Sequence, residues 1–95
     1  MLTIEEIKRT IEKIAPEYDL KRVTLFGSRA NGNFREDSDV DLIVEFSTPA
    51  VSLLKLISLK HKLEDFWGLS VDIIHGPISS ESILVVEKGI DIYAA

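Results

Sequence analysis

Hydrophobic residues recur along the chain with two different periods, three to four residues in some stretches and two residues in others. The opening stretch carries isoleucines at the helical period. Thr3 and Glu6 are placed as a capping box at its start, and Pro16 is placed as a stop. This pattern predicts an amphipathic helix over about residues 4–15.

A second helical pattern, rich in leucine, covers residues 51–67. Thr48 followed by Pro49 is typical of an N-cap and a first helical position, and Gly68 supplies the end signal. The apolar positions are more numerous than one amphipathic stripe requires, so part of this helix is a candidate protein interface.

The period of two predicts strands, which alternate with the helices. The predicted strands cover residues 22–26, 39–46, 69–74 and 90–93. Two shorter helical segments are expected, a turn beginning near Ser28 and a helix from Ser79 or Ser80 to about Glu87. The order αβ(α)βαβαβ indicates an α+β protein with one mixed sheet of about four strands flanked by helices.

Composition narrows the function classes. Ninety-five residues, of which 45% are hydrophobic, predict a single domain over residues 1–95. The net charge of −5 argues against direct binding of nucleic acid through a basic surface. No cysteine is present, which excludes disulfides and thiolate metal sites. With neither a leader-like N-terminus nor a long apolar run, a cytoplasmic protein without membrane contact is expected.

Carboxylates interrupt two of the predicted strands. Asp39 and Asp41 share one strand face about 6.5–7 Å apart along the chain, and Asp72 lies in a later strand. A desolvated carboxylate is costly unless it is paired or bound to a cation, and ligand sets made of oxygen suit Mg²⁺ or Mn²⁺. The alternative for each aspartate is a solvated strand end or an ion pair with a nearby arginine.

Gly27 and Ser28 follow the strand that ends at Phe26. Glycine lets the backbone turn sharply and approach a ligand, and a serine at a helix start can present a hydroxyl and N–H groups to phosphate. Taken alone, this dipeptide is also a common loop element. The stretch lacks the lysine of a P-loop and the middle glycine of a dinucleotide fingerprint.

Together these residues carry a family resemblance. Gly27 and Ser28, ten residues, the Asp39-x-Asp41 pair and a third aspartate, Asp72, resemble the signature of polymerase-β-type nucleotidyltransferases. The wider run LFGSRANG…SDVDLIVEF is similar to their shortest prokaryotic members, the minimal nucleotidyltransferase (MNT-type) antitoxins. Asn31 departs from the pattern, since many relatives carry arginine there.

The resemblance implies a role for each site residue. Asp39 and Asp41 would hold two Mg²⁺ ions, with Mn²⁺ as an alternative. Asp72 would complete the site and orient or deprotonate the acceptor. Gly27 and Ser28 would hold the β- and γ-phosphates of ATP. Arg29 is a candidate for a further phosphate contact, with a solvent-facing helix position as the alternative.

The resemblance also implies an activity and a partner. The expected reaction transfers AMP from ATP to a tyrosine hydroxyl of a HEPN-type ribonuclease toxin, so the chain would act as an antitoxin enzyme. Two alternatives remain: an antitoxin that blocks its partner by occlusion, and transfer to a small molecule such as an aminoglycoside. A homodimer or a hetero-oligomer with the toxin is compatible with the sequence.

Overall fold

The computed structural model describes residues 2–32, 35, 38–48, 51–76 and 89–95. The elements in chain order are α1 (Ile4–Tyr18), β1 (Leu20–Phe26), α2 (Ser28–Asn31), β2 (Val40–Phe46), α3 (Leu53–Trp67), β3 (Val71–His75) and β4 (Ile90–Ala94). The strands form one sheet in the order β3-β2-β1-β4, in which β1 is antiparallel to β2 and β4 while β2 and β3 are parallel. The predicted α+β class with a four-stranded mixed sheet is confirmed.

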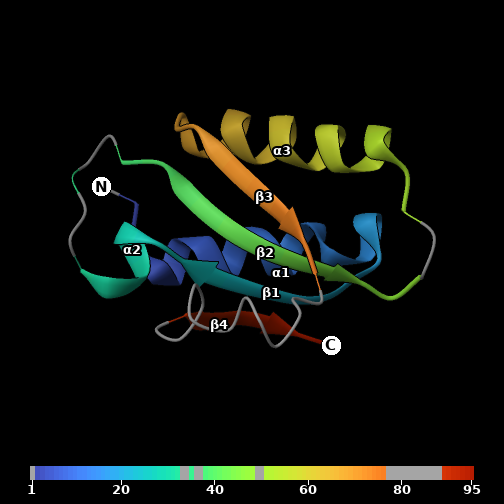
Figure 1. The fold of residues 1–95 in the computed structure, drawn as a ribbon, viewed down its shortest axis with the longest axis horizontal. Coiled ribbons are helices and arrows are strands. Elements are labelled where there is room, and N and C mark those ends of the chain that lie inside the picture. The colour runs from blue at the N-terminus through green and yellow to red at the C-terminus, as the bar shows by residue number, and fades with distance from the viewer. Residues whose placement is uncertain (1, 33–34, 36–37, 49–50, 77–88) are drawn as a thin grey trace.

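The two long helices and one face of the sheet enclose the core (Figure 1). Helix α1 contributes Ile7, Ile11 and Ile14, and α3 contributes Leu59 and Leu63. Alternate residues of the two central strands meet them, namely Val23 and Leu25 of β1 and Val40, Leu42 and Val44 of β2, all fully buried. Because strand residues alternate between faces, the residues between these core positions point to the opposite face of the sheet.

Helix α1 extends beyond the predicted stop at Pro16. It continues to Tyr18, and Asp19 closes it in the left-handed conformation (φ 55°) by donating its N–H to the Ala15 carbonyl. Tyr18 is only 7% exposed, and its hydroxyl is hydrogen-bonded to Ser58 of α3 at 2.8 Å. The prediction that Pro16 ends the helix was wrong, because the packing of Tyr18 outweighs the cost of a proline in the last turns.

Helix α3 begins two residues later than predicted, and its cap is not Thr48. Ser52 has extended backbone (φ −77°, ψ 153°), and its hydroxyl accepts a hydrogen bond from the Lys55 N–H at 3.1 Å. A hydroxyl closer to the helix therefore satisfies the first-turn N–H groups. Gly68 ends the helix in the left-handed conformation (φ 65°), as predicted. Pro49 lies outside the described residues.

All four predicted strands and the short helix after Gly27 are present, with ends that differ by two residues or fewer. The predicted helix from Ser79 or Ser80 to Glu87 lies outside the described residues. Among the helices of the described part of the chain, none combines the length and the apolar character needed to cross a membrane.

Candidate active site

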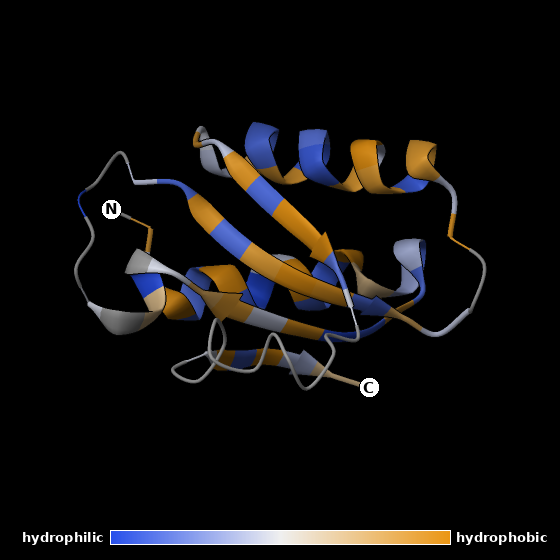
Figure 2. Ribbon diagram, in the orientation of Figure 1, coloured by the Kyte–Doolittle hydropathy of each residue, from blue (hydrophilic) through white to orange (hydrophobic). Residues whose placement is uncertain are grey.

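The register of the sheet brings two of the three predicted aspartates together. Asp41 of β2 lies opposite Asp72 of the parallel strand β3. Val40 and Val71, the preceding pair in the same register, are both fully buried in the core. A slip of one residue would expose these valines and bury a carboxylate, so the core holds the two aspartates side by side on the opposite face. Figure 2 shows the hydrophilic bands that cross the otherwise apolar strands β2 and β3.

Asp41 is the carboxylate of the described residues whose pKa is raised. Partial burial is the main cause of a raised pKa of Asp41, followed by the charge of Asp72, a hydrogen bond with Asp72 and the charge of Asp39. All of these effects disfavour the ionised form of Asp41. A cation bound beside the pair would reverse this balance.

Gly27 brings the main chain directly against Asp41. In the antiparallel register Asp41 lies opposite Phe26, the last residue of β1, so the next residue of β1 turns beside the carboxylate. Gly27 has φ 77°, and a Cβ atom added to it would overlap Oδ2 of Asp41. The sharp turn predicted at this glycine is present. The close approach to Asp41 was not predicted, and the approach to a phosphate stays a prediction.

Helix α2 begins immediately after this turn, at Ser28. The Ala30 N–H donates to the Gly27 carbonyl at 3.1 Å, which closes the first turn. The side chain of Ser28, predicted to contact phosphate, lies outside what the structure describes. The helix start was therefore predictable, while the phosphate role of Ser28 stays a prediction.

Arg29 is buried, with 3% of its surface exposed. Its Nε and Nη2 atoms donate to the Ser38 carbonyl at 3.2 and 2.9 Å. This contact fixes α2 to the residue that precedes Asp39 and thereby braces the entrance to β2. The alternative that the sequence left open for Arg29, a solvent-facing position, is wrong. The sequence did not predict the contact between Arg29 and the Ser38 carbonyl, because residue type alone does not reveal which carbonyl a buried guanidinium will reach.

Asp39 is exposed and lies immediately before β2, two residues from Asp41. Within the described ranges, no three carboxylate or imidazole side chains are gathered closely enough to form a ready-made metal cage. Mg²⁺ usually binds proteins through one or two carboxylates and takes its remaining ligands from waters and phosphates. The adjacent Asp41 and Asp72 fit that requirement, and Asp39, whose charge acts on Asp41, offers a further oxygen donor.

A model of the nucleotidyltransferase domain matches residues 4–91 of the chain. The chain belongs to this nucleotidyltransferase family. The match covers both long helices and all three aspartates of the site, so the chain is a nucleotidyltransferase.

Curated relatives agree with this assignment. The candidate protein adenylyltransferase MJ1217 of Methanocaldococcus jannaschii is 37% identical over 92 residues, which cover 87% of this chain and 93% of the relative. The protein adenylyltransferase MntA of Thermococcus cleftensis is 38% identical over 78 residues, or 78% of each chain.

Solved structures give the same fold. A candidate minimal nucleotidyltransferase is 32% identical and superposes with a TM-score of 0.73 over 94% of this chain and 95% of its own. One chain of a toxin–antitoxin complex with AMP-PNP superposes with a TM-score of 0.76 at 22% identity, over 93% of this chain and 73% of its own. The predicted minimal nucleotidyltransferase fold is thus confirmed.

Proposed function

We propose that this nucleotidyltransferase is an antitoxin that transfers AMP from ATP to a tyrosine hydroxyl of a HEPN-type ribonuclease toxin, in a reaction that depends on Mg²⁺. The observation that carries the proposal is the register that sets Asp41 beside Asp72, directly against the turn at Gly27. Two carboxylates and a close main-chain approach then lie within one small region of the sheet. Acidic metal ligands beside a main chain that contacts phosphates are recurring parts of enzymes that transfer phosphoryl groups.

Each residue has a distinct task in the proposed reaction. The acceptor oxygen forms a bond to the α-phosphorus, the bond to the β-phosphate oxygen breaks, and pyrophosphate leaves. Asp72, the exposed member of the aspartate pair, orients the acceptor hydroxyl and receives its proton or passes it to water. The turn at Gly27 and Ser28 holds the β- and γ-phosphates, because glycine at φ 77° lets the main chain turn sharply there.

Asp39, Asp41 and Asp72 would hold Mg²⁺, because carboxylate oxygens are ligands that suit this ion. When bound, the metal would neutralise the carboxylates and the charge that develops on the transferring phosphoryl group. Because the raised pKa of Asp41 disfavours its ionised form, a bound cation would favour ionisation of this carboxylate. Arg29 supports the site from the side by bracing the segment before Asp39.

The similar proteins support a protein acceptor. Curated relatives are named protein adenylyltransferases, including an MntA. Structural neighbours are chains of toxin–antitoxin complexes, among them a tri-AMPylated HEPN toxin of Shewanella oneidensis with its MNT antitoxin. We extend both features, the transferred AMP and the HEPN partner, to this chain.

The test is to incubate the purified chain with ATP, Mg²⁺ and the product of the adjacent gene, which the proposal requires to be a HEPN-type protein, and to follow the intact mass of that partner. We expect added AMP groups, and a fall of at least about 100-fold in rate for Asp41→Asn and Asp72→Asn. Asp65→Asn, on the exposed side of α3, is the matched control and should transfer normally. Absence of transfer to a folded partner would refute the proposal.

Antitoxin action by occlusion is separated by a second measurement. If the Asp39→Asn, Asp41→Asn double variant suppresses the partner in cells as well as the parent chain does, suppression does not need nucleotidyl transfer. Loss of suppression in this variant, with partner binding retained, supports the enzymatic reaction.

A further inference from the structure

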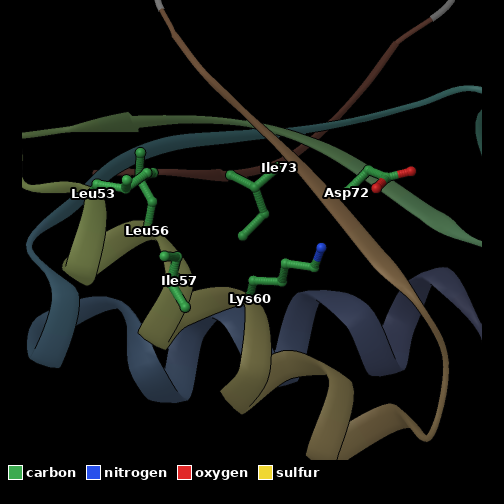
Figure 3. A pocket seen from close by; sticks show the side chains of 6 residues that line it. All are labelled: Leu53, Leu56, Ile57, Lys60, Asp72 and Ile73. Carbon is green, nitrogen blue, oxygen red and sulfur yellow. The ribbon is translucent and has the colours of Figure 1, made fainter.

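A shallow hollow of about 250 Å³ lies between α3 and β3 and reaches Asp72 (Figure 3). Its lining residues are Leu53, Leu56, Ile57, Lys60, Asp72 and Ile73. The volume is below the roughly 300–1,000 Å³ of pockets that enclose whole small ligands. A space of this size and apolar lining suits one inserted side chain rather than a nucleotide.

The first turns of α3 present an unusually apolar surface beside this hollow. Leu53 is 71% exposed, Leu54 is 78% exposed and Ile57 is 40% exposed. Figure 2 shows this apolar character in the first turns of α3, in contrast to the hydrophilic turns that follow. Neighbouring exposed leucine and isoleucine side chains on a small protein are typical of an interaction site.

Strand β3 borders the same hollow and is an edge of the sheet formed by the described strands. Ser70 and Gly76, on either side of it, form their main-chain hydrogen bonds toward β2. The Val71 N–H instead points away from β2 and is bound by the Glu64 carboxylate at 3.0 Å. By the alternation of a strand, the next main-chain groups on this outer side belong to Ile73.

Asp72 and Ile73 point to opposite faces of β3, yet both line the hollow. In Figure 3, Ile73 projects toward the side on which Leu56, Ile57 and Lys60 lie, and the Asp72 carboxylate projects from the other side of the strand. Successive residues of an extended segment that pairs with this edge would alternate in the same way. One side chain would enter the apolar hollow while its neighbour reaches Asp72.

We infer that this edge of β3 and the hollow beside it form the docking site for the acceptor segment of the partner protein. The segment binds in extended form, places an apolar side chain against Leu53 and Ile57, and thereby sets the adjacent acceptor residue at Asp72. This inference rests on the proposed function and adds a specificity rule to it. The acceptor hydroxyl should lie next to a large apolar residue.

Two other occupants fit less well. A triphosphate needs several converging donors, and Lys60 is the sole cation among the described residues that line the hollow. A second copy of this chain would cover the leucines, but Asp72 would then be closed to any acceptor. The continuity of the apolar lining with Asp72 favours a substrate segment.

The test compares surface variants on the same helix. Ile57→Asp and Leu53→Asp place a charge in the hollow, whereas Leu54→Asp changes an equally exposed apolar residue that does not line it. With the HEPN-type protein encoded beside this chain as the probe, kcat/KM for AMP transfer should fall at least about tenfold for the first two, through KM. Leu54→Asp should stay within about twofold. Ile57→Ala changes the same side chain without adding a charge, so it serves as the control for misfolding caused by the added charge.

Three further readouts separate the docking site from the function itself. The rise in melting temperature with Mg-ATP should be the same in Leu54→Asp and Ile57→Ala as in the parent, because neither places a charge in the hollow that Asp72 lines. Partner binding, measured by titration calorimetry, should weaken in parallel with KM. Light scattering should give the same mass for the parent and Ile57→Asp. If the parent is a dimer, Ile57→Asp is a monomer and both transfer AMP equally well, the inference is overturned.

Failure of the docking site and failure of the function give different results. Equal transfer by the parent, Ile57→Asp and Leu54→Asp overturns the docking site and leaves the function intact. No transfer by the parent, together with binding that Ile57→Asp weakens, overturns the function and keeps the docking surface. Neither transfer nor binding overturns both.

Discussion

Gly27→Ala should separate the conformational role of this glycine from its contact with Asp41. Alanine at φ 77° costs about 1–2 kcal/mol because the left-handed region crowds its Cβ atom. The added Cβ would also overlap Asp41 Oδ2 and lie 3.2 Å from Cγ and 3.4 Å from the Asp41 Cβ. Overpacking of this kind costs about 1–3 kcal/mol. The total is about 2–5 kcal/mol, and the Asp41 carboxylate must leave its position.

Two other glycines provide matched controls. Gly32 and Gly68 also have positive φ, at 83° and 65°, but an added Cβ at either meets no atom of the described residues within 4 Å. Gly32→Ala and Gly68→Ala should therefore lose only the conformational part, about 1–2 kcal/mol. Urea unfolding followed by circular dichroism measures all three, and AMP transfer should fall only in Gly27→Ala.

A double-mutant cycle isolates the contact. In an Asp41→Ala background the overlapping atoms are gone, so Gly27→Ala should cost only its conformational part. The coupling free energy between the two sites should be about 1–3 kcal/mol, the overpacking contribution. A coupling free energy near zero, or a Gly27→Ala chain that unfolds and transfers AMP like Gly68→Ala, would refute the close approach of Gly27 to Asp41.

Three more predictions concern the same region. Asp41→Asn should stabilise the metal-free chain at pH 7 by about 0.2–1 kcal/mol, the range for paired like charges in a sheet. Because the pKa of Asp41 is raised in the folded state, the folded chain binds more protons than the unfolded chain near that pKa. The stability of the parent should therefore fall more than that of Asp41→Asn as pH rises through the raised pKa. Arg29→Lys should cost about 1–3 kcal/mol in urea unfolding, whereas exposed Arg35→Lys should cost under about 0.5. Glu64→Ala, which leaves the Val71 N–H without its carboxylate, should cost about 1–2 kcal/mol and slow transfer, with Glu64→Gln retaining most of both.

The parts of the fold set by local sequence were predictable. The alternation of apolar residues around Asp41 predicted the strand and the face on which Asp41 lies, because side-chain direction in a strand depends only on position. The shared face with Asp39, which precedes the strand, stays a prediction. The end of α3 at Gly68 followed from the conformational preference of glycine. Local rules compete at helix ends, however. Ser52, not Thr48, caps α3, and Pro16 lies inside α1 rather than at its end. In each case the packing of the rest of the chain decided which of two local signals set the end of the helix.

The parts of the site that depend on distant pairing were not predictable from local pattern. Asp41 and Asp72 are far apart along the chain, and nothing in either segment states which residues lie opposite each other. The meeting of these two aspartates was expected only through the family resemblance. The family resemblance did not predict the contact between Arg29 and the Ser38 carbonyl, and a guanidinium can reach many carbonyl groups.

The core decides the register that the chemistry requires. Val40 and Val71 are paired and fully buried, while the next residues along both strands are the two aspartates. A shift of one residue would pair Asp41 with a core residue of β3 and force a carboxylate toward the helices, at a cost of several kcal/mol. The electrostatic repulsion between the aspartates is smaller than this cost. The apolar face of the sheet therefore holds the charged face in an arrangement that it would not adopt alone, and a bound cation would relieve the repulsion that remains.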